Sequence, residues 1–530
     1  MAVLASDNTA DTPLSCLGLL AFILGETWTL WSVVHNLYFH PLARFPGPIL
    51  ARISPLPYVI ALLRGRIPFW VKACHDKYGP VVRVSPNELS FDNEAAWKDI
   101  YGSRPGHNNF HKDPIHVGSI QSVPGVSTIT MANDADHARQ RRALSHAFST
   151  KALLEQEYIV KSYIDVFSLK MREFARLGKP VNVVDWFAYT TFDIIGDMAL
   201  GEPFGYLTSE DFHFWVPLIS SSIKAGAFEQ ATRRIAEADG YFQRQLLKLI
   251  PGRIRTTRIQ HLEYSREKIL KRMAQSESDH KDFLYYLLKQ QESGTINENE
   301  VIVNGALFII AGTETTAGFL AGLFNQLLRH PRVLQKLTDE IRSNFQSDTD
   351  INFEALVKLP YLSAVIDEGL RVFPSAPIGF CHREVILLTE SLYQKAYVIA
   401  KACAGTHYLI SWLTSSGQTT VSVPMWGATH SERNFKEPYN FLPERWLDKK
   451  NSTDKFGASN AFSLGPRGCI GRNLSYMEMR LIIGKLLWHN DVHFHGSNDA
   501  WDPEKDYPGL TVYNNWMKPG LWVKLTPRRG

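Results

Sequence analysis

The chain has 530 residues, of which 45% are apolar and 12% aromatic, so it can bury a large core and does not have the composition of a disordered protein. Its 57 lysines and arginines nearly balance its 53 aspartates and glutamates, which excludes the basic field that nucleic-acid binding requires. Five cysteines at irregular spacing do not form a disulfide framework, and this fits a reducing, cytosolic compartment for the soluble part.

The N-terminal region has the length and composition of a membrane anchor. Leu14 to Val34 is an apolar run, long enough to cross a bilayer, with Glu26 as its only charge. A cleaved signal peptide is the alternative, but no basic residue precedes the run and no small-residue cleavage site follows it. Arginines follow the run, which favours a cytosolic body. We therefore expect an N-terminal tail over 1–13, a transmembrane anchor over 14–36 and a proline-rich hinge over 37–56.

Beyond the hinge the chain is mainly helical. From Pro57 to Phe91, the run "VVRVS" and short apolar pieces between prolines predict a few strands. The expected fold class is mainly α with minor β (α+β), with β structure near the start and again after residue 370. Helical spacing of apolar residues is clearest over 136–149, 192–200, 297–330, 331–345, 362–373 and 473–489.

The predicted helix 297–330 is apolar nearly all round, so we expect it to run through the core. Its middle nevertheless reads "AGTETT", from Ala311 to Thr316. Glycine costs about 1 kcal/mol relative to alanine inside a helix, and threonine hydroxyls compete for the i−4 carbonyl, so this patch is expected to bend or loosen the helix. Two interpretations stay open: a proton relay or ligand pocket around Glu314, and a second transmembrane helix or plain core helix.

Two short motifs predict a buried ion-pair network. Glu368 and Arg371 lie three residues apart in "EGLR", on one face of a predicted helix. The surroundings of Glu368 are apolar, and Arg445 follows later in "PERW". We expect both arginines to share the single carboxylate of Glu368.

The stretch "FSLGPRGCIG", Phe462 to Gly471, places Cys469 in a glycine-rich turn before a predicted helix. Backbone N–H groups and the helix N-terminus are expected to lower the pKa of its thiol. A nucleophilic cysteine would require a histidine base, and a zinc site would require further ligands at close spacing; neither signature is present. A single thiolate is the kind of ligand that haem iron takes.

Together these motifs resemble the cytochrome P-450 superfamily. "FSLGPRGCIG" is similar at every fixed position to its haem-binding signature, and "AGTETT", "EGLR" and "PERW" resemble its other motifs in the same order. The resemblance begins at "YFHPLARFPGP" and covers nearly the whole chain. It is strongest to the fungal membrane-bound members of secondary metabolism, and "RRALSHAFS" and "TTFDIIGDMALGEPFG" are similar to stretches common in that group. It implies one catalytic domain over 57–530, with haem between the long central helix and the cysteine loop.

The resemblance implies a role for each matching residue. Cys469 would be the proximal ligand of the iron in a haem group (heme, iron protoporphyrin). On the opposite side, Ala311 and Gly312 would line the oxygen pocket, while Thr315 and Glu314 would guide protons. The remaining expected cofactor-binding residues, which pack near the thiolate or hold the haem propionates, are His137, Arg141, Arg383, Phe462, Arg467 and Gly471.

The implied reaction inserts one oxygen atom of O₂ into an apolar small molecule, such as a fungal terpenoid or polyketide. No dinucleotide or flavin motif occurs in the chain, so NADPH and flavin would belong to a separate flavoprotein reductase. The expected location is the endoplasmic reticulum membrane, with a single pass and a cytosolic catalytic domain. The substrate is expected to face five apolar or aromatic regions: Tyr101 to Thr130, Phe212 to Phe228, Asn304 to Phe308, Ser375 to Phe380 and Leu510 to Trp516.

One segment departs from the family pattern. After "CHREV", residues 386–414 replace the usual proline- and glycine-rich hairpin with a longer, unrelated run, and the pattern resumes at "SGQTTVSVPMW". An unremoved intron or frame error would explain this, and a true insertion is the alternative. Two other functions therefore stay open: a reductase-independent haem-thiolate isomerase or dehydratase, against which the intact "AGTETT" argues, and an inactive haem protein.

Overall fold

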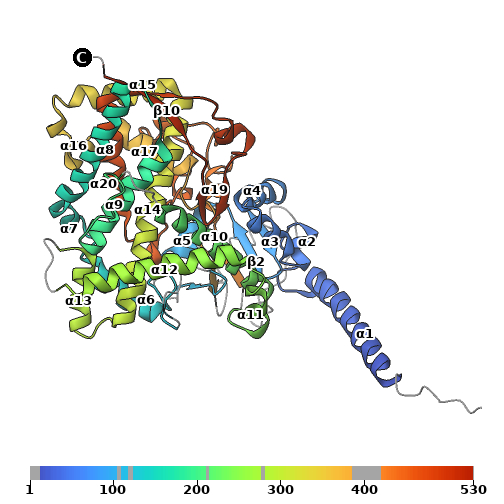
Figure 1. Ribbon diagram of the computed structural model, residues 1–530. Helices are drawn as coiled ribbons and strands as arrows, with labels where there is room; N and C mark the ends of the chain where they lie inside the picture. The colour runs from blue at the N-terminus through green and yellow to red at the C-terminus, as the bar shows by residue number, and fades with distance from the viewer. Residues whose placement is uncertain are drawn as a thin grey trace, which may run out of the picture.

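The computed structural model of the chain describes residues 12–103, 109–116, 123, 125–209, 214–275, 281–384 and 419–528, with side chains from residue 22 onward. Helices form most of the body, and small sheets lie at one side of it (Figure 1). The expected fold class, mainly α with minor β, is confirmed.

The helices differ widely in length, and the longest runs through the body. Their bounds are α1 Thr12–Val34, α2 Ile49–Ile53, α3 Leu56–Leu63, α4 Ile67–Tyr78, α5 Glu94–Tyr101, α6 Asp134–Ser145, α7 Thr150–Glu155, α8 Glu157–Leu177, α9 Val183–Leu200, α10 Trp215–Ile235, α11 Tyr241–Leu247, α12 Gly252–Met273, α13 Phe283–Glu292, α14 Glu298–Arg329, α15 Pro331–Asn344, α16 Phe353–Val357, α17 Pro360–Val372, α19 Met425–Thr429 and α20 Arg472–His489.

The largest sheet among the described residues has the strand order β1-β2-β6-β5-β3. Strand β6 pairs parallel to β2 and antiparallel to β5, so the two flanks of the segment 386–414 lie side by side in this sheet. The smaller sheets are β4-β10-β7 and β8-β9. The strand bounds are β1 Val81–Ser85, β2 Glu88–Phe91, β3 His111–Lys112, β4 Pro180–Asn182, β5 His382–Glu384, β6 Thr419–Ser422, β7 Asn490–Phe494, β8 Thr511–Tyr513, β9 Asn515–Met517 and β10 Trp522–Pro527.

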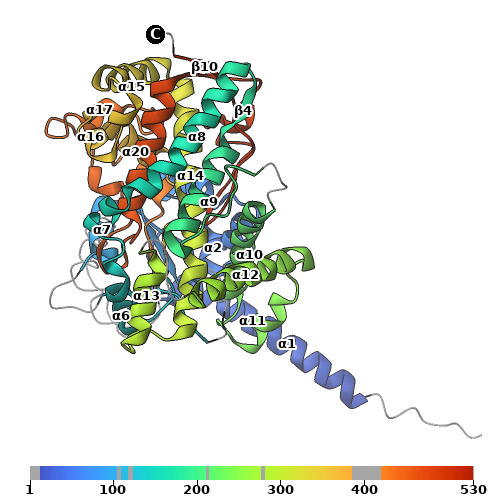
Figure 2. The ribbon, with the colours of Figure 1, turned by 60° about the vertical axis from the view of Figure 1, so that its left-hand side comes forward.

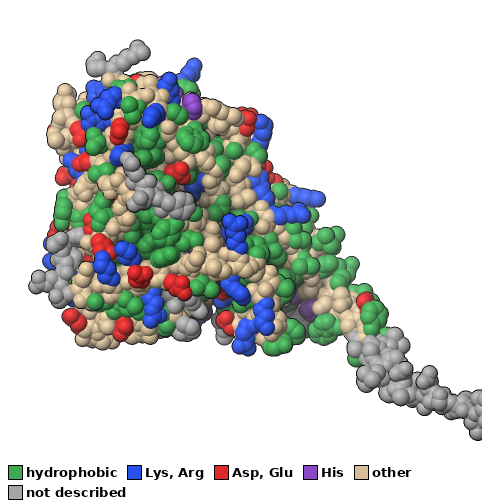
Figure 3. Space-filling view, in the orientation of Figure 1, with side chains coloured by type: hydrophobic (Ala, Val, Ile, Leu, Met, Phe, Trp, Pro, Cys, Tyr) green, Lys and Arg blue, Asp and Glu red, His purple; other side chains and the backbone are tan. Residues whose placement is uncertain are grey.

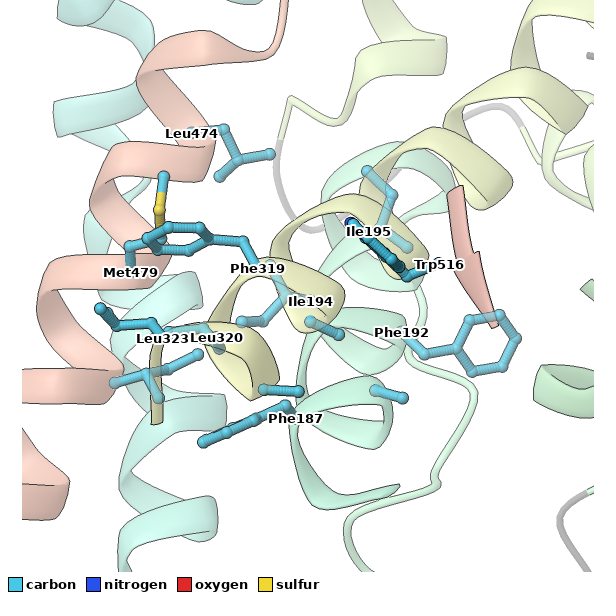
Figure 4. Close-up of a cluster of buried hydrophobic side chains, with 14 of the residues drawn as sticks. Phe187, Phe192, Ile194, Ile195, Phe319, Leu320, Leu323, Leu474, Met479 and Trp516 are labelled. Carbon is cyan, nitrogen blue, oxygen red and sulfur yellow. The ribbon is translucent and has the colours of Figure 1, made fainter. Parts of the chain in front are cut away.

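Helix α14 is the central element of the core. Asn297 starts it with a capping box: its side chain accepts from the N–H of Glu300, whose carboxylate accepts from the N–H of Asn297. Figure 2 shows α14 running beside α9 and α20, both of which contact it. The core side chains between these helices, several of them shown in Figure 4, include Phe187, Ile194, Ile195, Phe319, Leu320, Leu323, Leu474 and Met479.

The region 57–91 differs from the expectation. Two strands are present, β1 and β2, but helices α3 and α4 occupy most of the stretch before them. Pro57 and Pro68 stand in the first turn of these helices, where proline loses no hydrogen bond, so they start helices rather than separate strands.

The stretch expected to be a hinge packs against the body. Residues 49–53 form α2, and the N–H of Arg83 in β1 donates to the carbonyl of Pro46 at 2.8 Å. Arg52 donates to the carbonyls of Leu37 and Ala43 at 3.0 and 2.9 Å. This part of the chain is therefore held by the buried Arg83 and the half-buried Arg52, and it is not a simple extended connector.

Within the described part of the chain, α14 is the helix that is long and apolar enough to cross a membrane. Of its most apolar stretch, 78% is buried inside the body. Because neighbouring helices cover it, α14 is a core helix, and the interpretation as a second transmembrane helix is wrong.

Candidate active site

A cavity of about 370 Å³ lies between the middle of α14 and the loop that precedes α20. Most of its wall is apolar, as is usual for a pocket that binds a small molecule or cofactor. All five regions expected to face a substrate contribute to this wall, through Ile129, Ile223, Leu307, Ile378 and Asn515 among others.

The loop with Cys469 forms one wall of the cavity. The N–H of Cys469 donates to the carbonyl of Phe462 at 2.8 Å, which closes the turn. Gly465 has φ +64°, and a Cβ there would lie 2.1 Å from the carbonyl oxygen of Tyr101. Only glycine fits both conditions. The exposed surface of Cys469 faces the cavity, which Phe462 and Gly471 also line.

The N–H groups at the start of α20 lower the pKa of the Cys469 thiol, as expected, but in the protein alone its net pKa lies above the ordinary value. Burial raises this pKa, against the opposing effects of the Gly471 N–H and the Arg141 and Arg472 charges. One side of the sulfur faces the cavity, and protein atoms surround its other sides. Desolvation of the thiolate therefore raises the pKa by more than the nearby N–H groups and positive charges lower it.

Helix α14 forms the opposite wall. Ala311 is exposed although most of this helix is buried, and it lines the cavity together with Gly312 and Thr315. The hydroxyl of Thr315 donates to the carbonyl of Ala311 at 2.7 Å. The structure assigns α-helix without interruption from residue 298 to 329, so the open space here comes from small side chains rather than from a break in the helix.

Gly312 also sets the distance between two helices. A Cβ on Gly312 would lie 2.5 Å from the side chain of Ile195, which belongs to α9 and also lines the cavity. The absence of a side chain at 312 therefore lets α9 pack directly against α14.

Glu314 does not line the cavity, unlike its neighbour Thr315. Its carboxylate accepts from the hydroxyl of Ser220 at 2.8 Å and pairs with Nζ of Lys518 at 3.0 Å. Successive residues of a helix point about 100° apart, so Glu314 and Thr315 face different surroundings. The carboxylate of Glu314 therefore contacts Ser220 and Lys518 rather than the cavity.

A group of basic side chains lines one end of the cavity. Arg141 donates to the carbonyl of Gly468 at 2.6 Å, and Arg467 donates to the carbonyl of Ala132 and to Asp134 at 2.8 and 2.7 Å. The Nη1 atom of Arg467 is buried and has no partner among the described residues. The end of the cavity therefore offers an unused donor next to several positive charges, which suits an acidic group.

His137 and Lys112 belong to the same end of the cavity. Burial and the charges of Arg467 and Arg141 lower the pKa of His137 to about 4, so its imidazole is neutral at pH 7. Burial and the charge of Arg467 lower the pKa of Lys112 to about 7. The sequence predicts His137 but not Lys112, whose position depends on the pairing of β3 with β5.

Arg383 is the expected propionate-binding residue that the structure does not bring to the cavity. Its Nε lies 3.2 Å from Asp113, a buried carboxylate that also accepts from the hydroxyl of Thr420. Lys112, next to Asp113 in the chain, lines the cavity instead. Because neighbours in a strand point to opposite faces, Arg383 and Lys112 occupy different sides of this sheet edge.

The expected ion-pair network is present below the cysteine loop. Arg371 binds the carboxylate of Glu368 with two hydrogen bonds of 2.9 and 2.8 Å, and Nε of Arg445 lies 3.2 Å from the same carboxylate. Trp446 donates to Glu368 at 2.8 Å. Arg371 also donates to the carbonyls of Thr429, Pro438 and Asn440, so the network fixes the chain that leads to Cys469.

Sequence reasoning missed Glu478 of α20, which lines the cavity. Its Oε1 is buried without a partner among the described residues, and burial raises its pKa to about 8. The residue lies on the same helical face as Gly471 and Ser475, which also line the cavity, so helical spacing from the cysteine motif was the available signal.

Comparison with known families agrees with this geometry. The family profile described as Cytochrome P450 matches residues 52–393 and 416–514. The chain belongs to the cytochrome P450 family. The interruption of the match at 394–415 lies almost entirely inside the segment 386–414 that departs from the family pattern.

Three similar proteins come from fungi. The chain is 40% identical over 527 residues to cytochrome P450 monooxygenase aba2 of Botryotinia fuckeliana, covering 98% of this chain and 95% of the relative. It is 39% identical to cytochrome P450 monooxygenase ABA2 of Pyricularia oryzae, covering 93% of each chain. It is also 39% identical to cytochrome P450 monooxygenase astJ of Aspergillus oryzae, covering 94% of this chain and 95% of the relative. The expected monooxygenase class is confirmed.

The residues present fit the haem that this family carries. Cys469 offers a sulfur ligand on one wall, Ala311 and Thr315 leave open space on the other, and Arg467 has an unpartnered donor that would suit an acidic group of the haem at one end. When bound, the haem iron supplies the chemistry that activates O₂.

Proposed function

We propose that this cytochrome P450 inserts one oxygen atom of O₂ into an apolar small molecule of fungal secondary metabolism, a terpenoid or polyketide. The substrate C–H bond becomes C–OH, the second oxygen atom leaves as water, and two electrons come from NADPH through a separate flavoprotein reductase. The observation that supports this proposal is the pair of opposed walls, Cys469 on one and Ala311 and Thr315 on the other, around a largely apolar cavity.

The residues that line the cavity have defined roles in this proposal. Cys469 holds the iron by its sulfur, and Arg467, Arg141 and His137 hold the acidic groups of the haem at the basic end. The hydroxyl of Thr315, now bonded to the carbonyl of Ala311, turns to pass a proton toward the reacting oxygen. The apolar wall binds and orients the substrate and excludes water from it.

We also propose that residues 14–36 anchor the enzyme in the endoplasmic reticulum membrane by a single pass, with residues 57–530 as the cytosolic catalytic domain. Helix α1 leads away from the body, and Phe22, Leu24 and Trp28 on it are exposed (Figure 1). Hydrophobic side chains continue over the surface where α1 meets the body (Figure 3). Exposed apolar residues of α2 and α3 are Ile49, Leu50, Leu56 and Ile60.

The proposal is tested by deleting the gene in its native fungus and comparing metabolites under ¹⁸O₂. We expect a compound with one oxygen atom fewer to accumulate and the labelled product to disappear. Membranes that contain the full chain should then convert the accumulated compound only with NADPH and reductase. Conversion without NADPH would favour the isomerase or dehydratase instead.

A further inference from the structure

Helix α10 presents to the cavity one face that contains two unpaired polar atoms. Ser222, Gly226 and Gln230 line the cavity and are spaced by four residues, which places them on one face of the helix. The side chains of Ser222 and Gln230 are buried, with 1% and 4% exposure. In the part of the chain that the structure describes, neither Ser222 Oγ nor Gln230 Oε1 has a hydrogen-bond partner. Buried polar groups are ordinarily paired, so these atoms point to a ligand.

The two atoms are too far apart to bind the same group. Eight residues separate Ser222 from Gln230, which corresponds to about 12 Å along a helix. Gly226 lies between them and leaves space against the helix. A ligand on this face therefore lies along α10 and meets a different polar contact near each end.

Contacts of α10 place its two ends relative to the oxygen pocket. Ser220 donates to Glu314 at 2.8 Å, so the first half of α10 lies beside the Ala311–Thr315 stretch. Arg233 donates to the carbonyl of Pro114 at 2.8 Å, so the other end lies beside the segment that contains His116. Gln230 is therefore at the end of the cavity away from Thr315.

The groups near Gln230 favour an uncharged partner. His116 lines the cavity, and burial together with the charge of Lys112 keeps its pKa well below the ordinary value, so its imidazole is neutral. Lys112, whose charge acts on His116, lines the cavity together with Arg141 and Arg467, and in the proposed function the acidic groups of the haem pair with these three cations. The amide of Gln230 offers an acceptor oxygen and donor N–H groups, which match a hydroxyl or a carbonyl.

Resting on the proposed function, we infer that the substrate is an apolar skeleton that already carries one uncharged oxygen group, a hydroxyl or carbonyl, which Gln230 binds. Oxygen then enters at the opposite end of the skeleton, beside Thr315. The enzyme must therefore act after a reaction that has already placed an oxygen on the hydrocarbon.

The test is a spectral titration of the purified, haem-loaded full chain with three probes of one skeleton: decalin, 2-decalol and decalin-2-carboxylate. We expect 2-decalol to bind about tenfold more tightly than decalin, because only the alcohol pairs with the buried amide. It should also bind more tightly than the carboxylate. In Gln230→Leu the preference for the alcohol should fall to about twofold or less, mainly through tighter binding of decalin.

The control is Gln335→Leu, at an exposed glutamine of α15, which should keep the wild-type preference. If Gln230→Leu does not fold, Gln230→Met, which keeps the side-chain length, carries the same expectation. A wild-type protein that binds 2-decalol no better than decalin, or a Gln230 variant with the wild-type preference, overturns the inference. The titration needs only bound haem, so it is independent of NADPH-dependent turnover, whose absence would instead contradict the proposed function.

Discussion

Thr315 and Cys469 reach the cavity from opposite walls, so substitutions at Thr315 can separate turnover from cofactor binding. In Thr315→Ala we expect haem content to stay at the wild-type level and product per NADPH consumed to fall about tenfold or more, since a positioned proton donor is lost. Thr313→Ala is the matched control, because the hydroxyl of Thr313 also bonds back to a carbonyl, that of Ile309, but does not line the cavity. Equal losses in both variants would contradict the role of Thr315.

Arg383 and Arg467 are both expected to bind haem propionates, but only Arg467 lines the cavity. We expect Arg467→Gln to weaken haem binding about tenfold, because a charge-assisted hydrogen bond from its unpartnered Nη1 is removed. Arg383→Gln should bind haem like the wild type, since Arg383 pairs with Asp113 outside the cavity. The rate of haem transfer to an excess of apomyoglobin measures haem binding in both variants. A larger loss in Arg383→Gln than in Arg467→Gln would contradict this assignment.

At the residue scale, a sequence motif predicts which of its own side chains line the cavity. It does not predict the side chains that distant parts of the chain bring there through tertiary pairing. Cys469, Phe462 and Ala311 lie in motifs, and all three line the cavity. Lys112 lines it because β3 pairs with β5, a contact between residues 270 apart that no local pattern contains. Glu314 lies in a motif, but its direction depends on Lys518, which packs against it from the C-terminal region.

At the scale of the elements, the ion-pair network of Glu368, Arg371 and Arg445 holds the chain that leads to the cysteine loop. We expect Arg371→Leu to destabilise the protein by about 3–5 kcal/mol and to release haem, since it leaves the buried carboxylate of Glu368 without its main partner. Lys358→Ala is the control: it breaks an exposed pair with Glu354, which contributes about 0–1 kcal/mol. Thermal unfolding of both variants measures the difference, and similar melting temperatures would contradict the structural role.

The turn that presents Cys469 requires glycine at position 465. In Gly465→Ala the new Cβ would lie 2.1 Å from the carbonyl of Tyr101 at a positive φ, so we expect a loss of about 1–3 kcal/mol and reduced haem content. Gly252→Ala, at an open position without a positive φ, should not destabilise the protein. Urea unfolding followed by tryptophan fluorescence compares them, and a stable, fully haem-loaded Gly465→Ala variant is the adverse result.

Helix boundaries could be predicted well where caps and prolines mark them. The expected helix 297–330 is observed as Glu298–Arg329, because a capping box begins it and Pro331 follows it. The region 57–91 could not be predicted as well, because proline both interrupts strands and starts helices, and only packing decides between the two.

At the scale of the whole molecule, the segment 386–414 decides whether the chain as written is active. Residues 385–418 lie outside the described part of the structure, and the family match omits 394–415. The flanking strands β5 and β6 still pair, from His382 with Val421 to Glu384 with Thr419. We therefore expect deletion of residues 394–415 to leave haem binding intact, as measured by haem content per chain. Complete loss of haem in the deletion variant would show that the segment is required for the fold.

The central claim is that iron binds the sulfur of Cys469 in the cavity below α14. The most direct measurement is the carbon monoxide difference spectrum of the reduced full-length protein, with Cys469→Ser beside it. We predict the long-wavelength Soret band that thiolate ligation gives in the wild type and its loss in Cys469→Ser. A wild-type spectrum without that band, or an unchanged band in Cys469→Ser, would contradict the claim.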